Sequence, residues 1–127
     1  MAWLYHYKSK DKIGYCELSQ RDTVVGRDKG CTLQITGDDL VSRQHARVRF
    51  EKTDGRYHLI DLNSENGTYI NDEQIKSEVI LDDYDIIGVG DSTLVFSHEK
   101  LSNTKNLQDR IKRRGEEDKD TLKRKNT

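Results

Sequence analysis

A serine, an arginine and a histidine stand close together in the stretch "VSRQHARVRF", which runs from Val41 to Phe50. Ser42 precedes His45 by three residues, and Arg43 lies between them. A hydroxyl beside an imidazole could be a nucleophile with its general base, whereas a hydroxyl beside a guanidinium could bind an anion. The stretch could also be an ordinary polar turn, so three interpretations are open at this point.

Catalysis by Ser42 and His45 has little support elsewhere in the sequence. A serine nucleophile needs a histidine within hydrogen-bond reach, a third group that orients the histidine, and donors for an oxyanion. The sequence contains no GxSxG elbow, and the other three histidines are scattered over stretches that resemble strands. We therefore expect no enzymatic activity and assign no catalytic residue.

Metal and cofactor sites are not predicted either. The glycines of "GRDKG" and "GVGDS" lack the lysine and Ser/Thr of a phosphate-binding Walker A loop. Cys16 and Cys31 form no CxxC motif or Cys/His cluster, and two cysteines do not make a disulfide framework. No stretch approaches the roughly 20 apolar residues of a membrane span. We expect a cytoplasmic protein without a cofactor, a metal or a membrane contact.

Length and charge divide the chain into two parts. The 127 residues contain 22 Lys and Arg against 23 Asp and Glu, and only 32% are hydrophobic, which allows one small core. Residues 1–98 have a net charge of −5 and residues 99–127 a net charge of +4. We predict a folded domain over 1–98 and a charged tail or linker over 99–127. Leu107 and Ile111 are one helical turn apart, but Gly115 interrupts the pattern, so helix and disorder both remain open for the tail.

The elements that would position Ser42 are short strands. Alternation in "ARVRFEK" puts Ala46, Val48 and Phe50 on one face, which is typical of a half-buried strand. Asp54-Gly55 tolerates the positive φ angles of a two-residue hairpin connection, and Asn66-Gly67 is another turn signal. Many short strands without a long helical period predict an all-β sandwich or small barrel. Function is expected in the loops, which such a scaffold presents at its ends.

Three fragments follow one another in a recognisable order. "VVGRDKGCTLQI" contains Gly26-Arg27, "VSRQHA" contains Ser42 and His45, and "DLNSENGTYIN" contains Asn66-Gly67. On an all-β background they resemble the forkhead-associated (FHA) domain, whose signature is GR, then SxxH, then NG. The resemblance covers the chain from about Trp3 to Ser97. It implies a β-sandwich of about eleven strands that binds phosphothreonine peptides through loops at one end.

The resemblance also implies the roles of four ligand-binding residues. Arg27 would pair with phosphate oxygens, and Ser42 would donate a hydroxyl hydrogen bond to the phosphate. Arg43 would add a second positive charge and a backbone N–H, and Asn66 would hold the peptide main chain. A phosphate group suits such a site, because it carries close to two negative charges and several acceptor oxygens.

Other matched residues are expected to support the site. Gly26 and Gly67 would serve turns that need a small residue or a positive φ. His45 would be hydrogen-bonded within the fold and hold the serine loop in position, and Asn71 would brace a loop.

Glu65 departs from the family pattern. This position beside the phosphate more often has a small, hydroxyl or basic residue. A carboxylate here could lower affinity by about 1 kcal/mol through like-charge repulsion, could point away, or could pair with a basic residue of the peptide.

The sequence thus favours a non-catalytic phosphothreonine-binding module in a Ser/Thr kinase pathway. Such a chain could be a small adaptor or the N-terminal sensor of a longer signalling protein. Its partner would be a phosphothreonine-containing protein or a phosphorylated segment of its own chain. Two alternatives stay open: a phosphate-independent scaffold or oligomerisation domain, and nucleic-acid binding by the tail. The last is disfavoured because acidic residues separate the two basic runs of the tail.

Overall fold

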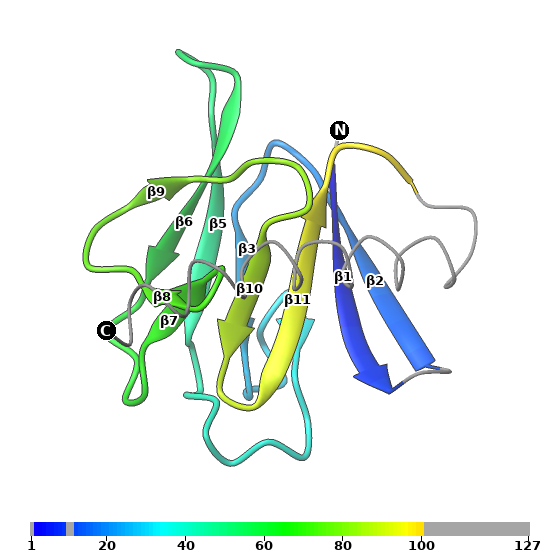
Figure 1. The fold of residues 1–127 in the computed structure, drawn as a ribbon, viewed down its shortest axis with the longest axis vertical. Coiled ribbons are helices and arrows are strands. Elements are labelled where there is room, and N and C mark those ends of the chain that lie inside the picture. Colours follow the sequence, from blue (N-terminus) through cyan, green and yellow to red (C-terminus); the bar gives the residue numbers. More distant parts are fainter. Residues whose placement is uncertain (1, 10–11, 101–127) are drawn as a thin grey trace, which may run out of the picture.

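The computed structural model describes residues 2–9 and 12–100 of the chain (Figure 1). The predicted tail lies outside the described residues from position 101 onward, and so does the question of its helical or disordered state. Eleven strands are present in the described part, and it contains no helix. They are β1 Ala2–Ser9, β2 Lys12–Leu18, β3 Thr23–Gly26, β4 Leu33–Gln34, β5 Ala46–Glu51, β6 Arg56–Asp61, β7 Thr68–Ile70, β8 Glu73–Gln74, β9 Val79–Ile80, β10 Ile86–Val89 and β11 Ser92–Ser97.

The strands form two sheets that pack as a sandwich, so the predicted fold class is confirmed. One sheet has the order β2-β1-β11-β10-β7-β8 and the other the order β4-β3-β5-β6-β9. β3 pairs with β4 in parallel, whereas the central pairs β3 with β5, β5 with β6, and β1 with β11 are antiparallel. The long β5–β6 and β1–β11 ladders make the two sheets stiff supports for the loops at their ends.

Apolar side chains from both sheets fill the space between them. Leu4 and Phe96 come from the six-stranded sheet, and Val48 and Leu59 from the five-stranded sheet, and all four have at most 1% of their surface exposed. The alternation that predicted the β5 strand is observed at Ala46 and Val48, which are buried with the partly covered Arg47 between them, and Phe50 is partly buried against the core. Burial of these faces is the main stabilising contribution to the sandwich.

The turn between β5 and β6 differs from the predicted two-residue connection. Glu51 pairs with Arg56, so residues 52–55 form a four-residue loop. Only Gly55 of the Asp54-Gly55 pair has a positive φ, at 68°, and its N–H donates to the Glu51 carbonyl at 2.8 Å. A type I′ connection would need positive φ at both central residues, so the Asp54-Gly55 pair does not form one here.

Within residues 2–9 and 12–100, no helix is long and apolar enough to cross a membrane.

Candidate functional site

Three loops come together at one end of the sandwich, which is the lower end in Figure 1. They join β3 to β4, β4 to β5 and β6 to β7. Backbone hydrogen bonds tie the first two loops to each other. The Arg27 N–H donates to the Ser42 carbonyl at 3.0 Å, and the Asp28 N–H donates to the Arg43 carbonyl at 3.1 Å. These two loops therefore form one platform, which bears Arg27, Ser42 and Arg43.

His45 links this platform to the third loop. Its ring is completely buried. The Ser42 backbone N–H donates to Nδ1 at 3.0 Å, and Nε2 lies 2.8 Å from the Gly67 carbonyl. Because Nδ1 accepts, the proton must sit on Nε2, which donates to Gly67. Both ring nitrogens are thus used in cross-linking the loops.

Within the described residues, the Ser42 hydroxyl has one hydrogen bond, and it keeps its proton for another. Its Oγ accepts the Glu65 backbone N–H at 3.0 Å. A hydroxyl that accepts in this way can still donate its own proton. Ser42 is only partly buried, so this proton can reach a ligand that arrives from solvent.

Arg27 is held by one edge of its guanidinium. Its Nε donates to the Val41 carbonyl at 3.1 Å. Among the residues that the structure describes, none accepts a hydrogen bond from its two terminal nitrogens. Arg27 and Arg43 are both exposed. Two cationic groups are therefore available on the platform that also carries the Ser42 hydroxyl.

Gly26 permits the close approach of the first two loops. A β-carbon at this position would lie 2.2 Å from the Arg43 carbonyl oxygen and 2.9 Å from the Cys31 sulfur. The Cys31 thiol donates to the same carbonyl at 3.1 Å. Burial raises the pKa of the Cys31 thiol, which keeps it protonated as a donor. Any larger residue at position 26 would push the Arg43 backbone away from Arg27.

Asn66 ties the third loop to the serine loop. Its side-chain Nδ2 donates to the Leu40 carbonyl at 3.0 Å, and the side chain is otherwise exposed. The next residue, Gly67, has a φ of 87°, and a β-carbon there would lie 2.6 Å from Nε2 of Gln74. The Asn66-Gly67 turn therefore needs glycine for its backbone angle, while the Gln74 side chain could move aside for a β-carbon.

A small network of polar side chains stabilises the third loop, which joins β6 to β7. Asp61, at the end of β6, accepts hydrogen bonds from the Ser64 hydroxyl and, at 2.6 Å, from the Thr68 hydroxyl. The Gly67 N–H in turn donates to the Ser64 oxygen at 3.0 Å. Partial burial alone would raise the pKa of the Asp61 carboxyl. The hydrogen bonds from Ser64 and Thr68 outweigh it and hold this pKa below its usual value.

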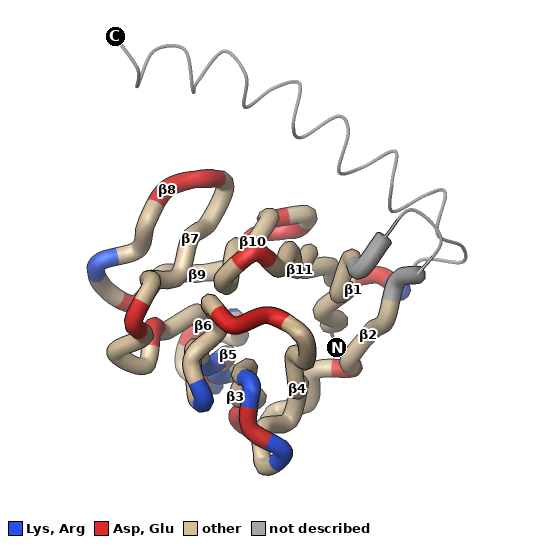
Figure 2. Tube along the Cα trace, turned by 90° about the horizontal axis from the view of Figure 1, so that it is seen from below, with Lys and Arg blue, Asp and Glu red and all other residues tan. Residues whose placement is uncertain are grey.

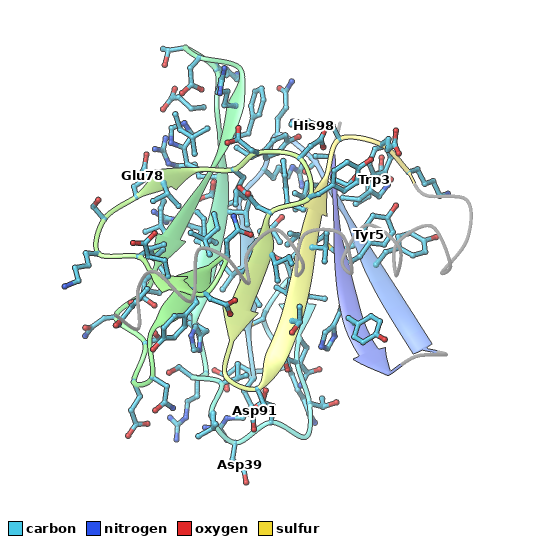
Figure 3. All side chains as sticks on the ribbon, viewed as in Figure 1. Trp3, Tyr5, Asp39, Glu78, Asp91 and His98 are labelled. Carbon is cyan, nitrogen blue, oxygen red and sulfur yellow. The ribbon has the colours of Figure 1, made fainter. Side chains whose placement is uncertain are left out.

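Asp38 fixes the other side of the serine loop to the turn between β10 and β11. Its carboxylate accepts the Leu40 N–H at 3.1 Å, the Asp91 N–H at 2.9 Å and the Ser92 hydroxyl at 2.7 Å. Asp39 and Asp91 project from these two loops (Figure 3). A groove of about 500 Å³ opens here, lined by His6, Tyr7, Thr36, Gly37, Asp38, Asp39, Leu40, Asp91 and Ser92. The platform is thus bordered by an acidic groove on the side of Leu40.

Asn71 braces a different part of the sandwich. It has a positive φ of 49° at the β7–β8 turn. Its Nδ2 donates to Asp85 at 3.0 Å, and its Oδ1 accepts the Ile86 N–H at 2.9 Å. Asn71 therefore joins the turn to the start of β10, and these hydrogen bonds do not involve the loop platform.

The geometry argues against the Ser42–His45 pair as a catalytic unit. The imidazole receives the backbone N–H of Ser42 and not its hydroxyl. A general base must reach the proton that it abstracts, and this ring has no free nitrogen to do so. In the part of the chain that is described, no group of three His, Cys, Asp or Glu side chains could hold a metal ion.

A family model accounts for this loop arrangement. The sequence matches the FHA domain model over residues 23–90, which is more than half of the chain. The chain belongs to the FHA domain family. The match begins at β3 and ends at the β10–β11 turn, so it contains all three loops of the platform.

Curated relatives of this FHA domain include an inhibitor and a regulator from bacteria. An oxoglutarate dehydrogenase inhibitor from Corynebacterium diphtheriae is 44% identical over 79 residues, which cover 62% of this chain and 52% of that protein. The glycogen accumulation regulator GarA from Mycolicibacterium smegmatis is 37% identical over 79 residues, covering 62% of this chain and 48% of GarA. The chain thus spans about half the length of the curated relatives it matches.

Solved structures share the fold as well. An FHA domain whose interactions are described as phosphothreonine-dependent has a TM-score of 0.66 and 27% identity, covering 79% of this chain and 98% of that one. EmbR from Mycobacterium tuberculosis, solved with a low-affinity phosphopeptide, has a TM-score of 0.67 and 27% identity. The match covers 80% of this chain and 25% of EmbR.

The structure brings together most of the residues predicted for the site and adds others. Arg27, Ser42, Arg43, Glu65 and Asn66 belong to the three converging loops, with Gly26, His45 and Gly67 beneath them. Sequence reasoning missed the Asp61 network and the Asp38 brace. The spacing of Asp61, Ser64 and Thr68 within "DLNSENGT" is a signal that could have found the first. The Asp38 brace has no local signal, because its partners Asp91 and Ser92 lie more than fifty positions away.

Proposed function

We propose that this FHA domain is a non-catalytic module that binds phosphothreonine peptides on the loop platform. The observation that supports this most is the state of the Ser42 hydroxyl. It accepts from Glu65 and thereby keeps its proton for a ligand, next to the guanidinium of Arg27. In the bound complex, Ser42 donates to one phosphate oxygen and the terminal nitrogens of Arg27 donate to others.

The charge of the platform favours a phosphate over a carboxylate. Arg27 and Arg43 together supply two positive charges, which match the charge of nearly −2 on a phosphorylated side chain at neutral pH. A guanidinium held by its Nε edge also loses little further freedom when its remaining N–H groups bind oxygen atoms.

Asn66 supplies the peptide-holding group of this proposal. One of its amide protons is fixed on Leu40, which orients the side chain toward the loop surface. The second amide proton and the carbonyl oxygen can then pair with a peptide backbone, which offers both an acceptor and a donor at each residue.

The relatives support the ligand class and the setting. One similar FHA domain is described by phosphothreonine-dependent interactions, and EmbR was solved with a phosphopeptide. We accordingly propose a partner phosphorylated by a Ser/Thr kinase, either another protein or a segment of the same polypeptide, in a cytoplasmic setting. Residues 1–98 would form the binding domain and residues 99–127 a charged tail.

Calorimetry with three matched peptides tests this function. A phosphopeptide library identifies a binding sequence, which is then made with phosphothreonine, phosphoserine and unmodified threonine. We expect binding only with a phosphate. The phosphothreonine peptide should bind about fivefold more tightly than the phosphoserine peptide. This factor corresponds to about 1 kcal/mol, the free energy gained by burying one additional methyl group. Equal binding of all three peptides would refute the proposal.

Arg27→Ala should remove the phosphate-dependent part of the affinity. Charge-assisted hydrogen bonds contribute about 1.5–3 kcal/mol each, so we expect the affinity for the phosphopeptide to fall by about tenfold to a hundredfold. Arg56→Ala is the matched control, because Arg56 is exposed and starts β6 next to the β5–β6 loop, which lies at the upper end in Figure 1. Binding that survives Arg27→Ala and Ser42→Ala would instead identify a phosphate-independent scaffold.

A further inference from the structure

Asn66 and Gly67 form the single Asn-Gly pair of the chain. In such a pair the backbone nitrogen of the second residue can attack the side-chain amide carbon of the first. Glycine favours this attack, because it has no β-carbon beside the nitrogen and permits backbone angles that other residues avoid. Asn66 is exposed, and Gly67 has a φ of 87°. The pair therefore has the composition and the exposure that favour deamidation.

Deamidation exchanges one amide for another and then hydrolyses it. The Gly67 nitrogen forms a bond to Cγ of Asn66, the bond from Cγ to Nδ2 breaks, and Nδ2 leaves as ammonia with the proton of the Gly67 nitrogen. Water then opens the cyclic imide at one of its two carbonyl carbons, which gives aspartate or isoaspartate. Both products carry a carboxylate at neutral pH. Water is the co-reactant, and nothing is oxidised or reduced.

Two hydrogen bonds hold the attacking residue in the folded domain. The Gly67 N–H donates to the Ser64 hydroxyl oxygen at 3.0 Å, and the Gly67 carbonyl lies 2.8 Å from Nε2 of the buried His45. The nitrogen must lose its proton to form the imide, and a hydrogen bond made through this proton opposes that loss. Ser64 is itself fixed, because its hydroxyl donates to Asp61. The Ser64 oxygen therefore restrains the nucleophile.

The amide group that the reaction removes connects two loops of the platform. Nδ2 of Asn66 donates to the Leu40 carbonyl at 3.0 Å. A carboxylate in its place can only accept hydrogen bonds, so it would repel that carbonyl oxygen. Glu65 precedes this position, and Gln74, beside Gly67, belongs to β8, where Figure 2 shows an acidic segment. Conversion of Asn66 would therefore separate the third loop from the serine loop and add negative charge where an anionic ligand binds.

We propose that Asn66 is a deamidation site whose reaction is restrained by the Ser64 hydroxyl, and that its conversion to aspartate or isoaspartate inactivates the loop platform. The chain then contains its own slow route to loss of ligand binding, which needs no enzyme. The modification itself is independent of the proposed function, and only the loss of binding rests on it.

Peptide mass spectrometry of the full chain, incubated at pH 8, tests the modification. Deamidation is detected as the mass gain that accompanies replacement of NH₂ by OH. We expect Asn66 to react faster in Ser64→Ala than in the wild-type chain by about fivefold or more, the factor that corresponds to one hydrogen bond. Asn71 is the internal control, because its amide is bonded to Asp85 and Ile86 in both proteins. Equal rates at Asn66 in the two proteins would overturn the proposal.

Thr68→Val is the matched control variant. It removes a hydrogen bond to Asp61 from the same loop and leaves the Ser64 oxygen with Gly67. The rate at Asn66 should stay close to the wild-type rate in this variant and in Ser64→Thr, which keeps a hydroxyl. Acceleration in Thr68→Val equal to that in Ser64→Ala would assign the protection to general loop stability and overturn the role of Ser64.

The wild-type chain provides a test that does not depend on the folding of a variant. Unfolding in guanidinium chloride breaks the hydrogen bonds of Gly67 with Ser64 and His45 together. We expect the reaction at Asn66 to become faster by about tenfold or more, because two hydrogen bonds are lost. An equal rate in the folded and the unfolded chain would refute the restraint.

A binding measurement tests the inactivation. Ion exchange separates the deamidated chain, which has one more negative charge, from the unmodified chain, and both are titrated with the same phosphothreonine peptide. We expect binding by the deamidated chain to be weaker by about tenfold or more, and Asn66→Asp should reproduce this loss. Equal binding by the two forms would overturn the inactivation. Absence of binding by the unmodified chain would instead refute the proposed function and leave the mass-spectrometric result as it stands.

Discussion

At the scale of single residues, the site depends on which hydrogen-bonding groups the protein leaves unused. The Ser42 hydroxyl accepts the Glu65 backbone N–H, the Arg27 Nε donates to the Val41 carbonyl, and the Asn66 amide donates one proton to the Leu40 carbonyl. Each side chain is thereby oriented and still retains a donor. Preorganised donors lose less freedom on binding than mobile ones, which favours affinity for an anionic group.

Glu65 sets the charge next to these donors. Its backbone N–H is fixed on the Ser42 hydroxyl, and its side chain is exposed. We expect Glu65→Gln to strengthen phosphopeptide binding by about twofold to fivefold, because it removes a repulsion of about 0.5–1 kcal/mol and keeps the backbone contact. Calorimetry at low and high salt checks this, since the gain should shrink as salt screens the charge.

Glu17→Gln is the control for this measurement, because it removes the same charge from the exposed outer side of β2. Weaker binding by Glu65→Gln would contradict the repulsion and would indicate that Glu65 pairs with a basic residue of the peptide.

At the scale of elements, short contacts between backbones hold the loops in register. The β3 end and the serine loop approach so closely at Gly26 that no side chain fits between them. His45 fills the gap between the serine loop and the Asn66-Gly67 turn with a buried ring bonded on both sides. The signature residues GR, SxxH and NG are thus parts of one connected structure, in which small or buried residues position the exposed ones.

Gly26→Ala tests this loop contact. The added methyl group would lie 2.2 Å from the Arg43 carbonyl oxygen. We expect a loss of about 1–3 kcal/mol in the free energy of unfolding, typical of overpacking, and at least tenfold weaker phosphopeptide binding. Gly30→Ala, in the loop that follows Gly26, is the control, because nothing lies within 4 Å of its added methyl group.

Denaturant unfolding and calorimetry on both variants measure the two effects. Equal stability and equal binding of Gly26→Ala and Gly30→Ala would contradict the close approach of the two loops.

At the scale of the whole molecule, the loops of the site are hydrogen-bonded to strands of the sandwich, so the structure of the site depends on the stability of the domain. Asp61 ends β6, a central strand of the five-stranded sheet, and holds the third loop through Ser64 and Thr68. Its carboxylate therefore couples loop structure to the stability of the sandwich.

The lowered pKa of Asp61 gives this coupling a pH dependence. A carboxyl group whose pKa is lower in the folded state contributes stability above its unfolded pKa of about 3.9, and this contribution is lost as the pH falls toward the folded pKa. We expect the free energy of unfolding to fall with pH below about 4. Urea titrations between pH 3 and pH 6 measure it, and Asp61→Asn should show a weaker dependence than the wild-type chain. An unchanged pH dependence in Asp61→Asn would contradict this role.

The sequence by itself determined the class of fold and most of the platform. Period-two alternation and glycine-containing turns are local properties, and "GR", "SRQH" and "NG" identify the loops, because each motif needs its residue types at a fixed spacing. The four-residue loop between β5 and β6 was not predicted, since Asp-Gly is compatible with several hairpin geometries.

Only the tertiary structure decided how the loops meet. The sequence already disfavoured Ser/His catalysis, but only the structure shows that the imidazole receives the backbone N–H of Ser42 and not its hydroxyl. The Asp38 brace likewise joins loops that are far apart in the sequence. Its physical basis is the pairing and packing of the two sheets, which brings together side chains that no local sequence pattern connects.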